Sequence, residues 1–313
     1  MSIALPVALS RWLPIVLAGL LLPATGRAAV HCANNATQLR TILAIVGSNG
    51  EADEVRIRNV RMPTSIVMAL ETTYLANLAD GKDLVISGGW RDNFCSAQDP
   101  DARRTVLLPA AGARLLRIDT PTVAQAVRPT VTVTNLTLAG VDFPGAAGCA
   151  LLTFGAHNAR VVRVAITDHR CGSAYATQVM GGSVHLVGNL FAYNQTVDAT
   201  AFAYADGSNH ASQVVLTGNT FTGNALDAAW VARFPGNAGT IKWVENNVAW
   251  GNQYGPGVAQ VQEIELSGAI QARVRNNSSA IGAGLLAAGN GNLVGQAGFV
   301  DGTALPRASS PLR

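Results

Sequence analysis

Residues 184–194, VHLVGNLFAYN, begin a pattern that returns three times further along the chain. Each copy has an alternating apolar strand, an Asn at a bend, a short second strand and a second Asn five residues later. The later copies are VVLTGNTFTGN (214–224), WVENNVAWGN (243–252) and VRNNSSAIGAG (274–284), the last with Gly282 in place of the second Asn. A period of about 20–50 residues is typical of repeat proteins, and short strands and turns within it predict a β-solenoid.

The first Asn of each copy defines a column whose members are 30, 28 and 30 residues apart: Asn189, Asn219, Asn247 and Asn277. In stacked parallel coils, equivalent residues lie about 4.8 Å apart, so their side-chain amides can hydrogen-bond along the column. We therefore predict a structural Asn ladder. Asn also tolerates a left-handed backbone, which places the bend at these residues. The same column extends backwards to Ile166 and Leu136.

The composition is consistent with a solenoid. Charged residues are 13% of the 313 residues, against roughly 25% in average proteins, and hydrophobic residues are 49%. Solenoids grow in one dimension, so this length requires no further division into domains. No copy shows the L-x-x-L-x-L spacing of leucine-rich repeats. A net charge of +3 without a basic run gives no indication of nucleic-acid binding.

The first 28 residues are typical of a secretory signal peptide. Arg11 precedes an apolar run over residues 12–24, and Gly26 and Ala28 suit cleavage after Ala28. The run is too short to span a bilayer, and no later run has membrane length, so we expect no integral membrane segment after cleavage. These features predict export to the medium, the cell surface or the periplasm.

Four cysteines follow the expected cleavage point: Cys32, Cys95, Cys149 and Cys171. An even number in an exported chain predicts two disulfides, with three connectivities open. Pairing the nearer partners favours Cys32–Cys95 and Cys149–Cys171. Neither these spacings nor those of the histidines match a zinc site.

Residues 29–80 differ from the repeats. Leu39, Ile42, Leu43 and Val46 have the spacing of an amphipathic helix, with Asn35 or Thr37 as its cap, and a strand follows at residues 54–60. A solenoid exposes unpaired strand edges at its ends, and a short helix can cover them. We therefore expect an N-terminal cap over residues 29–80 and a β-helix domain of roughly eight coils over residues 81–313.

Two further stretches carry a resemblance. In DLVISGGW (83–90) a strand ends in Gly-Gly-Trp, and a loop with Phe94 and Asp99-Pro100 leads to a Thr105-Val106 strand; the chain ends in GFVDGTALPRASSPLR (298–313). Both resemble bacterial exported right-handed parallel β-helix proteins of the pectin-lyase-like fold. That resemblance implies an all-β, right-handed parallel β-helix. The family includes polysaccharide lyases, glycoside hydrolases and adhesins, so the fold alone does not decide the function.

Candidate chemistry lies between the Asn copies. Asp198 and Asp227 follow the second Asn of adjacent coils, and Arg233 comes soon after. If the two carboxylates meet, they could act as acid and nucleophile on a sugar, with Arg233 beside them, or bind a calcium ion, the one cofactor that the sequence suggests. The simpler explanation is that both aspartates cap turns.

Four aromatic residues near these carboxylates are candidate ligand-binding residues because aromatic rings can stack on a bound partner: Tyr204, Trp230, Trp250 and Tyr254. A second polar group, Asp168-His169-Arg170, resembles the Asp-His motifs of pectate lyases. The remainder of that pattern is absent, which favours a solvated turn next to a disulfide.

No complete catalytic set stands out. We therefore expect an exported, non-catalytic β-helix that presents a surface to a glycan or another extracellular partner. The alternative is a polysaccharide lyase or glycoside hydrolase that acts on the outward face around Asp198, Asp227 and Arg233.

Overall fold

The fold is taken from a computed structural model of the chain. It describes residues 28–62, 72–99, 101–121, 128–143, 149–155, 157–174, 177–180, 182–199, 203–206, 213–226, 231–233, 240–255, 263–265, 269–279 and 290–294. Residues 1–27 of the predicted signal peptide and the C-terminal stretch 298–313 that carries part of the resemblance lie outside these residues.

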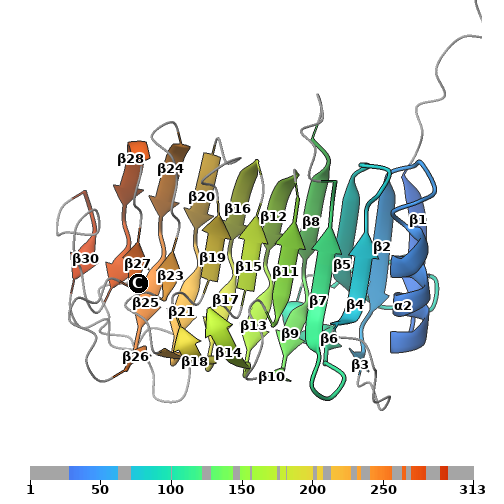
Figure 1. The fold of residues 1–313 in the computed structure, drawn as a ribbon, viewed down its shortest axis with the longest axis horizontal. Coiled ribbons are helices and arrows are strands. Elements are labelled where there is room, and N and C mark those ends of the chain that lie inside the picture. Colours follow the sequence, from blue (N-terminus) through green and yellow to red (C-terminus); the bar gives the residue numbers. More distant parts are fainter. Residues whose placement is uncertain are drawn as a thin grey trace, which may run out of the picture.

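The described residues form a rod of stacked coils (Figure 1), and each regular coil contributes one strand to each of four sheets. The first sheet has nine strands: β1 (Ala29–Ala33), β2 (Asp53–Arg58), β5 (Leu84–Trp90), β8 (Thr130–Thr134), β12 (Asn158–Val162), β16 (Ser183–Val187), β20 (Gln213–Thr217), β24 (Thr240–Glu245) and β28 (Ala269–Arg275). The second sheet has β3 (Arg61–Met62), β6 (Val106–Leu107), β9 (Thr137–Ala139), β13 (Ala165–Thr167), β17 (Leu190–Ala192), β21 (Thr220–Thr222), β25 (Val248–Trp250), β29 (Ser278–Ser279) and β30 (Leu293–Val294).

Two smaller sheets complete the coils. The third sheet has β10 (Asp142–Phe143), β14 (Arg170–Ala174), β18 (Gln195–Ala199), β22 (Ala225–Leu226) and β26 (Gln253–Tyr254). The fourth has β4 (Thr72–Asn77), β7 (Arg114–Asp119), β11 (Leu151–Phe154), β15 (Thr177–Met180), β19 (Ala203–Asp206), β23 (Ala232–Arg233) and β27 (Ile264–Glu265). Neighbouring strands pair in parallel, as β16 does with β20 and β17 with β21. The predicted parallel β-helix is confirmed.

The N-terminal end is covered by α2 (Ala36–Ile45), visible at one end of the rod in Figure 1. Asn35 caps this helix by accepting a hydrogen bond from the Gln38 backbone N–H, and Leu39 and Leu43 are buried against the first coil. The predicted helix is therefore present. Strands β2, β3 and β4 already pair in register with β5, β6 and β7, so the coils start before residue 81. A short 3-10 helix, η1 (Ala102–Arg104), precedes β6. Within the described part of the chain, no helix has the length and apolarity to cross a bilayer.

The Asn ladder is confirmed, and it carries the bend between the first and second sheets. Asn219 Oδ1 accepts from the backbone N–H and side-chain amide of Asn189, at 3.0 and 2.9 Å. Asn219 Nδ2 donates to Asn247 Oδ1 at 3.0 Å and to the Leu186 carbonyl at 2.8 Å. All the ladder side chains are buried, so the ladder satisfies backbone groups that have no access to water.

The ladder has one more member than the sequence period indicated. Asn292 accepts from the Asn277 backbone N–H and side-chain amide, both at 3.0 Å, and extends the column beyond the fourth copy. The left-handed backbone is not at the ladder residues themselves but one residue earlier. Gly188, Gly218 and Asn246 have φ of 65°, 65° and 58°, so the bend that we expected at each Asn lies at its predecessor.

The sequence analysis also assigned the wrong residue to the ladder column in one coil. Cα pairing aligns Ala165 with Thr137 and with Leu190, which puts Val164, and not Ile166, beside Leu136 and Asn189. Ile166 belongs two residues later, as the Cα partner of Phe191. Phe191 stacks in turn on Phe221, with ring centroids 4.8 Å apart. Both Val164 and Ile166 are apolar and buried, so the sequence of a coil without Asn does not distinguish them.

Candidate binding surface

A second polar ladder lies at the bend between the second and third sheets. Asn194 Oδ1 accepts from the His169 backbone N–H at 3.2 Å, and Asn224 and Asn252 continue the column. His169 occupies the position of an Asn. Its Nδ1 accepts from the Val141 backbone N–H at 3.0 Å, and its Nε2 bonds the Leu138 carbonyl at 2.9 Å.

These contacts fix the role of the Asp168-His169-Arg170 group. His169 is buried, and burial lowers its pKa to about 4, so its ring is neutral and Nε2 carries the proton that bonds Leu138. The expectation of a solvated turn is wrong for His169, because its ring replaces an Asn amide inside the rod. Asp168 has the left-handed φ of 59° that precedes each ladder residue. Arg170 is exposed, and its Nη1 lies 3.9 Å from Asp142 Oδ1.

Two of the three predicted catalytic residues are described, and they lie on different sheets. Asp198 is in β18 of the third sheet, with Ser173 as its Cα partner, and Arg233 is in β23 of the fourth sheet, with Tyr204 as its Cα partner. The position of Asp227 is outside the described residues, so the expected carboxylate pair stays a prediction. Among the described residues, no three His, Cys, Asp or Glu side chains gather as metal ligands would.

The predicted aromatic residues are also spread over the rod. Tyr204 is in β19, Trp250 is half-buried in β25, and Trp230 lies outside the described residues. Tyr254 packs against the core, and its hydroxyl donates to Glu263 Oε1 at 3.4 Å. Burial, together with the nearby Glu263 carboxylate, raises the pKa of Tyr254. Their role in ligand binding stays a prediction.

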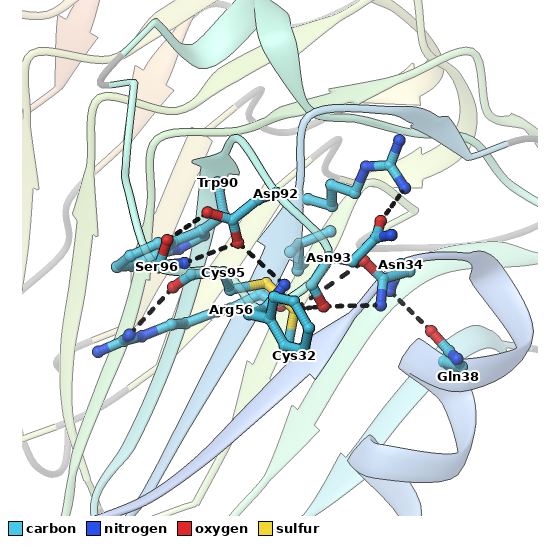
Figure 2. Close-up of a disulfide and its surroundings, with 12 residues drawn as sticks. Cys32, Asn34, Gln38, Arg56, Trp90, Asp92, Asn93, Cys95 and Ser96 are labelled. Carbon is cyan, nitrogen blue, oxygen red and sulfur yellow. Dashed lines mark hydrogen bonds between the residues drawn. A yellow bond between two sulfur atoms is a disulfide. The ribbon is translucent and has the colours of Figure 1, made fainter.

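Both predicted disulfides are present, Cys32–Cys95 and Cys149–Cys171, with Cα atoms 5.7 and 5.9 Å apart. The first ties β1 to the loop that follows β5 (Figure 2). Disulfides persist in oxidising compartments, so the pair indicates an extracytoplasmic protein.

Hydrogen bonds hold the loop of the first disulfide in place, as Figure 2 shows. Asn34 Nδ2 donates to the Asn93 carbonyl, Arg56 Nη1 donates to the Cys95 carbonyl, and Asp92 accepts from the Ser96 backbone N–H. The Arg56 guanidinium also lies 4.2 Å from the centre of the Trp90 ring. The loop is therefore tied to the N-terminal cap by both covalent and hydrogen bonds.

The outward face of the first sheet carries an exposed aromatic residue that the sequence analysis missed. Trp243 in β24 is 43% exposed, and its Cα partners on the adjacent strands are Val215 and Arg273. Glu245, two residues along the same strand, pairs with Arg273 and Arg275, each with Nε 2.9 Å from Glu245 Oε1. Arg273, the Cα partner of Trp243, and Arg275, the Cα partner of Glu245, are therefore both paired with the same carboxylate.

The face continues along the rod in a straight column. Trp243 and Val215 are followed by His185 and Arg160, each the Cα partner of the one before. Burial is the main cause that lowers the pKa of His185, and the Arg160 charge adds to it, so His185 is neutral near pH 7. We call the outward positions Arg160, His185, Val215, Trp243, Glu245, Arg273 and Arg275 the tryptophan face. With three arginines and one glutamate, it has a net positive charge.

Trp243 was overlooked because the alternation of β24 appears inverted. In TIKWVE the apolar Ile241 and Trp243 point outward, whereas Lys242 is fully buried. Counting back from the ladder Asn would have shown which residues of β24 face the interior. The residues five and three positions before each Asn point inward, as Val214 and Leu216 do before Asn219.

The chain matches no protein-family model, no curated protein and no solved structure. Function is therefore inferred from the tryptophan face.

Proposed function

We propose that this protein is an exported, non-catalytic parallel β-helix of the pectin-lyase-like type that binds an extracellular glycan on the tryptophan face. The observation that carries the proposal is the exposed indole of Trp243 on the outward face of a parallel sheet, with the Glu245–Arg273 and Glu245–Arg275 ion pairs on the adjacent positions. An aromatic ring on a rigid surface can pack against the apolar face of a sugar without losing much side-chain entropy.

The geometry of the first sheet supports a chain-like partner. Its parallel strands repeat at about 4.8 Å, so outward side chains from Arg160 to Arg273 form a straight row along the rod axis. A linear polymer could lie along this row and contact several strands at once. The excess of arginine over glutamate favours an acidic polysaccharide over a neutral one.

The decisive experiment measures binding of the purified protein to a panel of acidic and neutral polysaccharides. We expect Trp243→Ala to weaken binding of the preferred polysaccharide by about tenfold or more, because a central Trp commonly dominates an interface. Phe94→Ala removes another exposed aromatic ring, on the loop of the Cys32–Cys95 disulfide, and should leave binding unchanged. Equal binding by wild type and Trp243→Ala would contradict the assignment of this face.

The same panel separates the non-catalytic proposal from the enzyme alternative. Release of shortened or unsaturated products by the wild-type protein would overturn the proposal of a non-catalytic protein. Asp198→Asn and Asp227→Asn would then show whether the aspartates predicted from the sequence carry that activity. Without product release, the tryptophan face remains a binding surface alone.

A further inference from the structure

The bend between the second and third sheets carries a row of residues with a left-handed backbone. Five successive coils contribute one residue each, with φ between 58° and 74°: Gly140, Asp168, Tyr193, Gly223 and Gly251. The backbone holds the row, since the Asp168 N–H donates to the Ala192 carbonyl and the Tyr193 N–H to the Thr222 carbonyl, both at 3.2 Å. The bend therefore presents one residue per coil at a fixed position on the rod.

Tyr193 is the unexpected member of this row. Glycine has no Cβ to clash in the left-handed region and aspartate tolerates it, but a bulky aromatic residue there is strained. Three of the five positions are Gly, so the bend itself requires no side chain. Strained residues cluster at functional sites, where the side chain is the reason that the strain is kept.

The ring of Tyr193 lies against the next coil. A Cβ atom at Gly223 would be 2.8 Å from both Cδ1 and Cε1 of the ring, so only glycine leaves room for the ring there. Tyr193 is nevertheless 56% exposed. The ring is thus supported on one side and accessible elsewhere, and a ligand that packs on it immobilises little that is not already fixed.

The surface around the ring is uncharged. In this coil and the next two, the bend residues are AYNQ (192–195), TGNA (222–225) and WGNQ (250–253), none of which carries a charge at pH 7. Gln195 and Gln253 are exposed, and Ala225, the Cα partner of both, lies between them. In the preceding coil, the equivalent positions hold Asp168 and Arg170, which have opposite charges.

We propose that this bend, formed by Tyr193, Gln195, Gly223 and Gln253, binds a neutral sugar whose pyranose hydroxyls are equatorial. Such a sugar has an apolar C–H face that packs on the tyrosine ring. Its hydroxyls both donate and accept hydrogen bonds, as the glutamine amides do. Gln195 and Gln253 are two coils apart, about 10 Å along the rod, so the site has room for more than one sugar unit.

The tyrosine bend is separate from the tryptophan face. Trp243 lies on the outward side of the first sheet, whereas Tyr193 lies between the second and third. The arginines of the tryptophan face favour an acidic polymer, and the uncharged bend favours a neutral one. This inference therefore does not rest on the function proposed for the tryptophan face.

The test is calorimetric titration of the purified protein with cellotetraose, a neutral chain of glucose units with equatorial hydroxyls. We expect saturable binding that Tyr193→Gly weakens by about tenfold or more, because an aromatic anchor commonly dominates an interface. This variant should fold, since it places at the bend the residue that three other coils have there. Tyr193→Phe keeps the ring and should bind within about threefold of wild type, because it loses at most the hydrogen bond of the hydroxyl.

Two glycines provide a matched pair that tests the support of the ring. Gly223→Ala displaces the Tyr193 ring, whereas Gly251→Ala adds the same methyl group, on the same left-handed backbone, where nothing lies within 4 Å. We expect Gly223→Ala to weaken cellotetraose by about tenfold and Gly251→Ala to remain within about threefold of wild type. Circular dichroism confirms that each variant is folded.

Trp243→Ala and tetragalacturonate, an acidic probe, separate the two sites. Trp243→Ala should leave cellotetraose binding unchanged, and its effect on tetragalacturonate tests the tryptophan face independently. Absence of saturable cellotetraose binding at about 10 mM, or unchanged binding in folded Tyr193→Gly, would overturn the proposal. Binding of a polyproline peptide instead of cellotetraose would also overturn it, by showing that the ring serves a protein partner.

Discussion

The Asn ladder gives the sharpest test of how this rod is stabilised. In Asn219→Ala, the Asn189 backbone N–H loses its acceptor and the Leu186 carbonyl loses its donor, with original distances of 3.0 and 2.8 Å. Both bonds are buried, and water cannot replace the missing amide without entering the core. An unsatisfied buried polar group costs about 1–3 kcal/mol, so these two backbone groups alone should lower the free energy of unfolding by about 2–6 kcal/mol. The side-chain amide of Asn189 also loses its acceptor and adds to that cost.

Asn252→Ala is the matched control, because Asn252 belongs to the second ladder but is only partly buried. Because Asn252 is itself partly exposed, a water molecule can take the place of the deleted amide, so we expect a loss of about 1 kcal/mol. Denaturant unfolding followed by circular dichroism measures both values. Hydrogen exchange of the Asn189 amide should accelerate selectively in Asn219→Ala. A cost for Asn219→Ala no larger than that for Asn252→Ala would refute the view that the buried amides hold the coils together.

Three further predictions concern buried polar groups. His169→Asn should preserve the free energy of unfolding to within about 1 kcal/mol, because an Asn side chain can make both hydrogen bonds of the ring. His169→Ala should lower it by about 2–6 kcal/mol, because the Val141 N–H and the Leu138 carbonyl lose their partners. Denaturant titration measures both values. The folded-state pKa of His169, about 4, lies below its unfolded value of about 6.5, so its stabilising contribution is present above pH 6.5 and is lost as the pH falls towards 4. His169→Asn should flatten this dependence of the unfolding free energy on pH. An unchanged slope would contradict the view that His169 is buried in its neutral form. Tyr74→Phe should raise the free energy of unfolding by about 1 kcal/mol, since the buried Tyr74 hydroxyl has no hydrogen-bond partner among the described residues, and a loss of stability instead would show that the hydroxyl is satisfied.

The sequence was sufficient for the fold wherever Asn marked the coil. The spacing of Asn189, Asn219, Asn247 and Asn277 predicted the ladder, because an amide that both donates and accepts is the group a buried stack of bends requires. The prediction failed in one of the two coils that it placed in the column without an Asn. There Val164 takes the ladder position, and an apolar side chain gives no sign of which apolar residue faces the bend.

The candidate site was less predictable for a different physical reason. His169 replaces an Asn through the relative positions of its two ring nitrogens, a similarity that residue type alone does not reveal. Trp243 lies on a strand whose buried Lys242 inverts the usual pattern of apolar residues inside and polar residues outside.

The hydrogen bonds of the ladder all run in one direction along the rod, and this direction determines how coils can be added or lost in evolution. From Asn189 to Asn277, each side-chain nitrogen donates to the oxygen of the following coil, so a unit of 28 or 30 residues has the same donor at one boundary and the same acceptor at the other. When one whole unit is gained or lost, the donor amide of one coil again meets the acceptor oxygen of the next, so the series of hydrogen bonds stays complete. Insertion of a single residue at the bend would move the next amide out of line. Such a chain can therefore lengthen by duplication in whole turns, and every new turn adds one more row to its outer surface.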